Sequence, residues 1–130
     1  MGAQIGAIGL FVNDMQTMVT FYRDVLGMDT NWNGEANAEL SAGGTKLIMY
    51  GRNDFETMVS HHFQYSKGLN GTMEIAFDYI IRSDVDKEYN RLIAAGATSV
   101  LTPTDEPWGQ RTCYVADPEG NLLEIGSFAK

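Results

Sequence analysis

The chain has 130 residues, of which 44% are hydrophobic and 20% are charged. These are the proportions of an ordinary globular protein, and the length suits one domain or two small halves that share a core. The net charge is −8, with no run of Lys or Arg. Such a surface argues against nucleic acid or an anionic membrane as a partner.

The sequence also predicts where the protein resides. Cys113 is the single cysteine, so no internal disulfide can form. The first residues, "MGAQIGAIGLFVND", lack the basic start and long apolar stretch of a secretory signal. No window is apolar over the length of a membrane span. We therefore expect a cytoplasmic protein without a membrane partner.

The first half reads as a strand, a helix and two short strands. In "QIGAIGLFV" the larger side chains Ile8, Leu10 and Val12 share one face, while small ones dominate the other. Apolar residues then recur at helical spacing after Asn13 or Asp14, either of which suits an N-cap, and Gln16 lies three positions after Asn13 as a capping box requires. Gly27 is the expected helix stop, and Gly43–Gly44 joins the two strands that follow.

The second half repeats this plan. The strand "GTMEIAFDYII" precedes a helix that begins at Ser83 or Asp84 and stops at Gly96, and three strands follow. In the turn "DPEGN", Pro118 supplies a fixed φ and Gly120 a positive one. We predict one domain of two modules, at about 1–60 and 71–130. Residues 51–70 form a long loop or a short helix between them, a candidate lid or linker.

Two segments resemble a known superfamily. "VNDMQTMVTFYRDVLGM" is similar to the first helix of the vicinal oxygen chelate proteins, and "PWGQRTCYVADPEGNLLEI" is similar to their closing hairpin. This superfamily includes glyoxalases, bleomycin- and fosfomycin-resistance proteins, extradiol dioxygenases and epimerases. The resemblance implies an α+β fold of two βαβββ modules, each a curved half-barrel of mixed sheet, assembled as a homodimer. It implies less about the reaction, because one fold hosts many chemistries.

The resemblance also implies four metal-ligand positions, one on each of four strands. They fall on Ala7, Ile48, Glu74 and Glu124, of which only the two glutamates can bind a metal. Sites of this kind need three or four nitrogen or oxygen ligands. The adjacent His61 and His62 lie in a polar segment typical of a solvated surface. No cofactor is therefore favoured, although a divalent metal held by Glu74 and Glu124 stays the alternative.

Glu74 and Glu124 each interrupt an apolar strand, where an unpaired carboxylate is costly. Strand alternation places both on the face predicted to be concave. There the pair would bind a metal, or would separate its pKa values and act as catalytic acid and base. Alternatively each is a fixed hydrogen-bonding group, with Glu124 paired to Arg111, or to Thr112 and Tyr114 across the hairpin. Both interpretations remain open.

The segment "EPWGQR" offers further candidates for ligand binding. Trp108 would form an aromatic wall of the pocket, or anchor the loop at the end of the barrel. Arg111 would clamp a carboxylate or phosphate of the ligand, or form a salt bridge with Glu124 or Glu106. Aromatic residues on the strands are candidates for the same wall, or else belong to the core: Phe11, Trp32, Tyr50 and Tyr114.

The function predicted is the binding of a small organic molecule in a barrel cavity, without a complete catalytic metal site. The alternative is a metal-dependent enzyme, either a lyase resembling lactoylglutathione lyase or a dioxygenase, with Glu74 and Glu124 as ligands. A third hypothesis is metal-free acid–base chemistry by the two glutamates, such as an epimerisation. The sequence leaves open whether the protein is an enzyme, what the ligand is, and whether modules pair within one chain or across a dimer.

Overall fold

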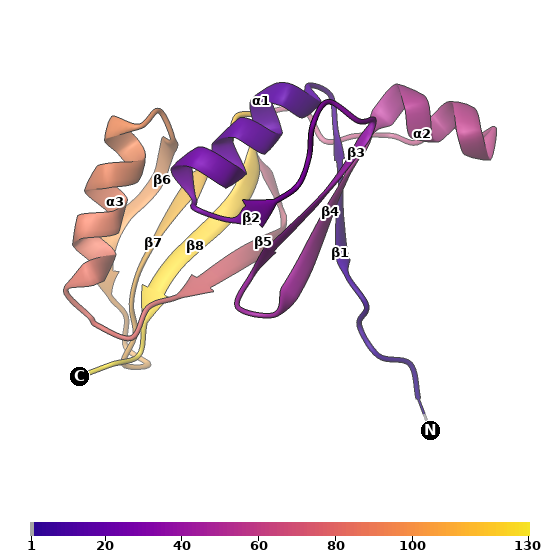
Figure 1. Cartoon of the computed structure of the whole chain (residues 1–130). Helices are drawn as coiled ribbons and strands as arrows, with labels where there is room; N and C mark the ends of the chain where they lie inside the picture. Colours follow the sequence, from indigo (N-terminus) through magenta and orange to yellow (C-terminus); the bar gives the residue numbers. More distant parts are fainter. Residues whose placement is uncertain (1) are drawn as a thin grey trace. The chain divides into compact units, whose positions relative to one another are not determined.

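A computed structural model describes residues 2–130 of the chain, which divide into two compact units with the boundary between Tyr65 and Ser66 (Figure 1). Each unit holds one four-stranded mixed sheet with its own helices. Both units have the element order strand, helix and three strands, which confirms the predicted repeat and α+β class. No helix among residues 2–130 is both long and apolar enough to cross a membrane.

The first unit contains six regular elements and one π-helical turn. They are β1 (Ile8–Val12), α1 (Met15–Thr20), the turn Phe21–Val25, β2 (Asp29–Thr30), β3 (Asn37–Ala42), β4 (Thr45–Gly51) and α2 (Arg52–Val59). The sheet order is β1-β4-β3-β2. β1 runs parallel to β4, and the other neighbours are antiparallel. Because β1 and β2 are edge strands, this sheet is open rather than closed into a barrel.

The start of α1 differs in detail from the prediction. Asp14 is the N-cap, and its Oδ1 accepts a hydrogen bond from the Thr17 amide at 3.1 Å. With Asp14 at the cap, the third helical position is Thr17 rather than Gln16, so the capping box expected from Asn13 does not form. The helix ends as predicted, because Gly27 has a φ of +78°, which glycine adopts without strain.

The sheet of the first unit has a buried and an open face. Leu10 and Val12 on β1 and Met49 on β4 are buried with the apolar side of α1. Phe11 and Tyr50 lie on the opposite, half-exposed face of the same strands. The alternation predicted for the first strand is confirmed.

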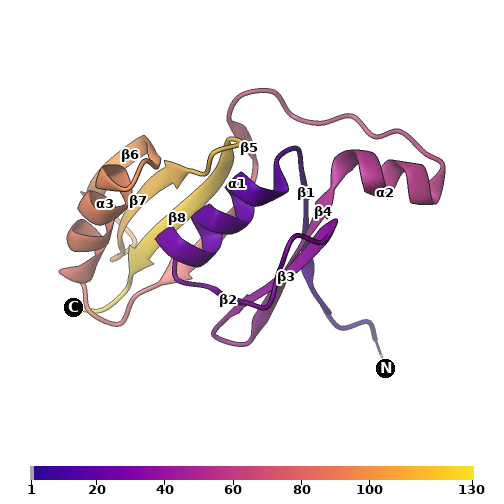
Figure 2. The same cartoon turned by 45° about the horizontal axis from the view of Figure 1, so that its top comes forward.

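The second unit contains five regular elements. They are β5 (Asn70–Asp78), α3 (Asp84–Ala94), β6 (Thr98–Asp105), β7 (Arg111–Ala116) and β8 (Asn121–Ser127). The sheet order is β5-β8-β7-β6, with β5 parallel to β8 (Figure 2). This order matches that of the first sheet strand for strand, so both modules have the same topology.

Helix α3 packs on one face of this sheet and defines the core of the second unit. Val85 and Leu92 on α3 have no exposed surface, and neither do Cys113, Val115 and Ile125 on the strands beneath. Other contacts between α3 and strands β6, β7 and β8 continue the layer. The helix ends at Gly96, whose φ is +106°. The sheet therefore has a covered face under α3 and an opposite face, called the open face because its β5 residues Glu74 and Asp78 are exposed, although Glu124 on β8 is buried there.

The turn before β8 shows why it needs a glycine. Gly120 has a φ of +88°, as predicted. A Cβ placed there would lie 2.1 Å from the carbonyl oxygen of Gly68, which is a severe clash. The buried Asp117 closes the turn by accepting hydrogen bonds from the amides of Glu119 and Asn121. The turn thus fixes where β8 begins.

The segment between the modules is partly helical. Residues 52–59 form α2, which ends at Ser60 in the left-handed conformation, and an extended stretch leads on to β5. Of the two predicted alternatives, a long loop or a short helix, the structure contains a helix followed by an irregular stretch. The chain divides between Tyr65 and Ser66, which lie within residues 51–70.

Candidate functional site

The open face of the second sheet is formed by three neighbouring strands. Its side chains alternate with those of the covered face, and strand register aligns them in rows. Each row takes one residue from each strand: Glu74, Leu122 and Ala116; Ala76, Glu124 and Tyr114; Asp78, Gly126 and Thr112. The two glutamates singled out in the sequence therefore share this face, on adjacent strands.

Glu124 is the buried carboxylate of this face, with 8% of its surface exposed. Its Oε2 accepts two hydrogen bonds, from Thr112 Oγ1 at 2.9 Å and from the Tyr114 hydroxyl at 3.0 Å. Hydrogen bonds to a charged acceptor are stronger than neutral ones and offset part of the cost of burial. Of the partners considered from the sequence, Thr112 and Tyr114 are therefore the ones that hold Glu124.

Glu74 is exposed and lies close enough to Glu124 to be affected by its charge. Partial burial, and then repulsion from the Glu124 carboxylate, raise the pKa of Glu74, while a hydrogen bond from Tyr114 acts in the opposite direction. Burial and the bond to Glu124 raise the pKa of Tyr114, so that it stays a donor at neutral pH. The hydroxyl of Tyr114 thus lies between two carboxylates.

Gln110 precedes β7 and lies at the Thr112 end of this face. Only 5% of its surface is exposed. Its Oε1 accepts a hydrogen bond from the indole nitrogen of Trp108 at 2.8 Å. Its Nε2 is so close to Gly126 that a Cβ at this glycine would lie 2.6 Å from it. Trp108, of which 62% is exposed, is therefore attached to the site through Gln110.

Arg111 lies on the other face of the sheet from the two glutamates. It alternates with Thr112 in β7, so its side chain points towards α3, where its Nε and Nη2 bind both oxygens of Asp86 at 3.0 Å. Its Nη1 binds Asp105 at 3.1 Å. The predicted salt bridge exists, but with these aspartates in place of Glu124 or Glu106. Arg111 was expected to bind the ligand together with the two glutamates, but it does not share their face of the sheet.

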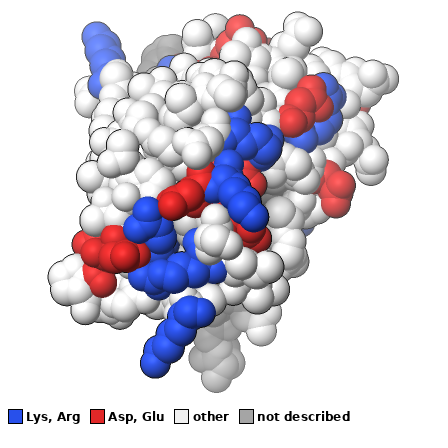
Figure 3. Space-filling view, turned by 90° about the vertical axis from the view of Figure 1, so that its left-hand side faces the viewer, with Lys and Arg blue, Asp and Glu red and all other residues white. Residues whose placement is uncertain are grey.

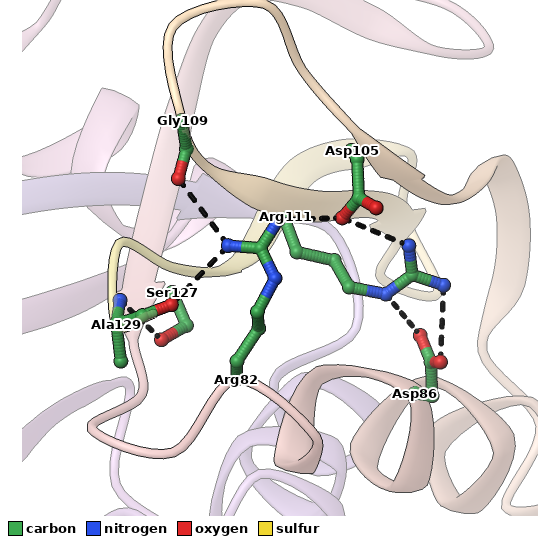
Figure 4. A network of polar contacts seen from close by, with 7 residues as sticks. All are labelled: Arg82, Asp86, Asp105, Gly109, Arg111, Ser127 and Ala129. Atoms are coloured by element: carbon green, nitrogen blue, oxygen red, sulfur yellow. Dashed lines mark hydrogen bonds and ion pairs between the residues drawn. The ribbon is translucent and has the colours of Figure 1, made fainter.

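A second arginine shares the Asp105 carboxylate (Figure 4). Arg82 donates to Asp105 at 2.6 Å, and also to the carbonyl oxygens of Gly109 and Ala129. Asp105 lies between the two guanidinium groups, which lower its pKa through hydrogen bonds and charge. This network joins the loop before α3, the end of β6 and the C-terminal tail.

The side of the molecule that carries α3 has charges of both signs next to one another. Lys and Arg side chains there lie beside Asp and Glu side chains (Figure 3). Arg91 pairs with Glu88, and Lys87 lies 3.9 Å from Asp84. The open face differs, since the nine residues of its three rows include three with carboxylate side chains and no Lys or Arg.

Phe11 and Tyr50, the aromatic candidates of the first unit, belong to an aromatic cluster. Phe11 stacks on Tyr50 with ring centroids 5.4 Å apart and on Phe63 at 5.8 Å, and it meets Phe55 edge-on at 5.0 Å. Tyr50 also lies over Gly9, where an added Cβ would be 3.3 Å from its ring. Neighbouring aromatic side chains thus cover much of the Phe11 ring. Trp32 lies elsewhere in this unit and lines a groove of about 490 Å³.

The segment after α2 is held down by Glu56. This carboxylate accepts hydrogen bonds from the Tyr65 hydroxyl and the Phe63 amide, and it contacts His62 Nδ1 at 3.0 Å. These bonds, that of Tyr65 first, lower the pKa of Glu56 to about 2. Arg52 lies 4.2 Å above the Tyr65 ring in a cation–π contact. The segment expected to be a lid or linker is therefore packed on its own unit.

The donor atoms of the open face do not match those of a divalent metal centre. Within residues 2–130, no group of three or more His, Cys, Asp and Glu side chains is placed to hold a metal ion. Glu124 already uses Oε2 for two hydroxyl donors. Ala7 and Ile48, at the other positions implied by the resemblance, have no donor atom in their side chains. Three or four protein ligands, as such sites require, are not provided.

Two βαβββ modules of identical strand order define the class of protein. This arrangement is that of the vicinal oxygen chelate proteins. A sequence model of the Glyoxalase/Bleomycin resistance protein/Dioxygenase superfamily matches residues 4–125, and the chain belongs to this superfamily.

Individual relatives agree with this placement. The uncharacterized protein YraH of Bacillus subtilis is 34% identical over 122 residues, which cover 91% of this chain and 93% of YraH. A glyoxalase/bleomycin resistance protein/dioxygenase family enzyme from Burkholderia phytofirmans superposes with a TM-score of 0.84 at 24% identity, covering 97% and 99% of the two chains. A lactoylglutathione lyase from Agrobacterium tumefaciens superposes at 0.75 with 20% identity, covering 97% and 94%. The two structures show the shared fold alone.

One residue of the open face escaped the sequence reasoning. Gln110 was not singled out, although it alternates with Thr112 and Tyr114 and therefore belongs to their face. The same alternation, applied to Arg111, places it beside Cys113 on the covered face. The signal was present in the alternation of "QRTCYV", which places Gln110, Thr112 and Tyr114 on one face and Arg111 and Cys113 on the other.

Proposed function

We propose that the protein binds a small organic molecule on the open face of its second sheet, without a resident metal ion. The observation behind this proposal is the pair formed by Glu124 and Glu74. A carboxylate that is 92% buried is kept on an apolar strand, held by the hydroxyl groups of Thr112 and Tyr114, next to a second and exposed carboxylate. Such an arrangement costs folding free energy and suits ligand recognition better than stability.

The hydroxyl donors support a binding role for Glu124. Thr112 and Tyr114 both bond to Oε2, which fixes the carboxylate in one orientation and leaves Oε1 for another donor. A rigid acceptor needs little further ordering when a ligand binds, which favours affinity. Glu74 and the exposed ring of Trp108 would complete a surface that is acidic at its centre and aromatic at one end.

The test of this proposal is the position at which small molecules bind. In ¹H–¹⁵N correlation spectra, titration with benzamidine, a planar organic cation, should shift the amides of residues 74–78, 112–114 and 122–126. Glu124→Gln should weaken binding several-fold, because it removes the buried charge. Asp24→Asn changes net charge equally at an exposed ion pair of the first unit and should leave binding unchanged. Shifts confined to other regions would contradict the proposal.

Metal binding provides a second test. If the open face is a metal-free site, neither divalent cations nor a chelator should change the midpoint of thermal unfolding, since a ligand of the native state alone would raise it. A stoichiometric metal in the purified protein, lost in Glu124→Gln, would instead support the metal-dependent lyase or dioxygenase. The glutamate retained after the "DPEG" turn is the feature that such an enzyme would use.

A second candidate function is proton transfer, and the raised pKa of Glu74 favours it. A carboxyl group whose proton is retained to higher pH, beside a second carboxyl group on the neighbouring strand, meets the requirement for an acid–base pair. Carboxyl ¹³C titration should show the pKa of Glu74 falling in Glu124→Gln, because one of its two causes is removed. An unchanged pKa would exclude this coupling and the acid–base proposal with it.

We also propose that the protein is cytoplasmic and that it forms a homodimer. The fold of the superfamily supports the dimer, and so do the free edges that each sheet retains. Sedimentation equilibrium should give twice the chain mass of 14.4 kDa at micromolar concentration. A single species of one chain would refute the dimer.

A further inference from the structure

The side-chain amide of Gln110 has a hydrogen-bond donor, Nε2, for which the described residues of the second unit provide no acceptor. Its Oε1 is occupied by the Trp108 indole, whereas its Nε2 makes no hydrogen bond in the part of the chain that the structure describes. No fully enclosed side-chain nitrogen or oxygen among those residues lacks a partner. Nε2 must therefore reach solvent, although 95% of the residue is buried. An otherwise buried side chain thus presents its amide donor outwards.

This donor lies beside the acidic site. The position that a Cβ would take at Gly126 is 2.6 Å from Gln110 Nε2 and 3.2 Å from Thr112 Oγ1. The Thr112 hydroxyl in turn donates to Glu124 at 2.9 Å. Since residue 126 is a glycine, the amide can lie flat on the sheet where a side chain would otherwise stand. One small molecule can therefore contact both Gln110 and Glu124.

We propose that Gln110 is a ligand-binding residue, which donates from Nε2 to a carbonyl-type acceptor on the molecule held by Glu124 and Glu74. This inference rests on the proposed function and names the ligand class. Ionised carboxylates only accept hydrogen bonds, so the ligand must offer N–H or O–H groups to them and an acceptor to Gln110. Carboxamides have both. Anions are disfavoured, because Asp78 adds a third negative charge to the face.

Trp108 acts as a positioning residue for Gln110. Because the indole N–H can only donate, it must meet the oxygen of the Gln110 amide, and this fixes the nitrogen on the side of Gly126. If the amide were flipped, two donors would face each other. The largely exposed indole ring also offers a flat surface beside the amide, on which the planar part of a ligand can stack.

The experiment compares three isosteric probes: benzamide, benzamidine and benzoate. Gln110→Glu keeps the acceptor for Trp108 but replaces the donor by a charged acceptor. It should weaken benzamide about tenfold, the effect of losing one hydrogen bond and gaining a repulsive one, and strengthen benzamidine. Gln110→Met removes the donor without adding charge, and should weaken benzamide while leaving benzamidine within about twofold. Benzoate should not bind to the wild-type protein.

The outcomes separate this inference from the proposed function. If benzamidine binds on the open face and benzamide is affected by neither variant, Gln110 has no role in recognition and the proposed function stands. Equal weakening of both probes in Gln110→Met would indicate a purely structural role and would also overturn the inference. If none of the probes shifts open-face resonances, both proposals fail. Trp108→Phe keeps an aromatic ring but frees the Gln110 amide to turn, and it should therefore weaken benzamide more than benzamidine.

Discussion

Replacing Thr112 by Val tests the idea that a hydroxyl group holds the buried Glu124. The substitution keeps the shape of the side chain and removes Oγ1, which lies 2.9 Å from Glu124 Oε2. Thr112 is 1% exposed and Glu124 is 8% exposed, so water cannot replace the lost donor without rearrangement. Among the residues that the structure describes, the carboxylate would then retain the Tyr114 hydroxyl as its one partner.

The expected cost follows from this geometry. A hydrogen bond to a charged group contributes about 1.5–3 kcal/mol. Oγ1 also lies 3.2 Å from the carbonyl oxygen of Ile125, and its single hydrogen is shared between the two acceptors. The lower part of the range therefore applies, and we expect a loss of about 1.5–2 kcal/mol in the free energy of unfolding. In urea the midpoint should fall by about 1 M with an unchanged slope.

Thr112→Ser is the matched control, because it keeps the hydroxyl and removes one methyl group. It should cost only about 1 kcal/mol, the value of one buried methyl group with its small cavity. A double-mutant cycle with Glu124→Gln then isolates the interaction between the two residues. If Thr112→Val lies within about 0.5 kcal/mol of the wild type, or if Ser is worse than Val, the hydroxyl does not stabilise Glu124 and our reasoning is wrong.

Three further predictions concern other residues. Gly126→Ala should destabilise the fold by about 1–2 kcal/mol and change Trp108 fluorescence, because its Cβ would lie 2.6 Å from Gln110 Nε2. Cys113 should react with thiol reagents at pH 8 only on unfolding, because burial raises its pKa to about 12. Glu56, whose pKa falls from 4.5 to about 2 on folding, stabilises the native state fully above its unfolded pKa, and this contribution is lost between about pH 4.5 and 2. Glu56→Gln should remove that part of the pH dependence in acid unfolding, and an unchanged profile would contradict it.

The fold could be predicted because its signals are local and repeated. Strand alternation located the buried side of β1, and the helix stops at Gly27 and Gly96 have the positive φ values that only glycine adopts freely. Both modules show the same order of strands and helix in the sequence, so the elements predicted in one half supported those predicted in the other. The precise N-cap was harder, because Asn13 and Asp14 are equally good caps and the choice depends on backbone geometry at the end of β1.

The site was predicted only in part, since its members are brought together by register. Alternation placed Glu74 and Glu124 on one face, and the structure confirms this. The partner of Arg111 depends on which residue of α3 lies over β7, and sequence spacing does not fix that packing. Asp86 and Asp105 were therefore missed, while the nearby acids Glu106 and Glu124 were favoured by proximity in the chain.

Gly126 and Gln110 show how residues of a candidate site can be missed when each residue is judged by its type alone. A glycine within an apolar strand costs stability and usually marks a place where something approaches the backbone closely. Here the approaching group is the side-chain amide of Gln110, sixteen positions earlier in the chain and directly before the neighbouring strand β7. Neither residue is informative alone, because glycine carries no chemistry and glutamine is common on surfaces. Together they position the Nε2 donor of Gln110 near the buried carboxylate of Glu124. Because of this pairing, we expect the chain to recognise a ligand that carries a carbonyl group.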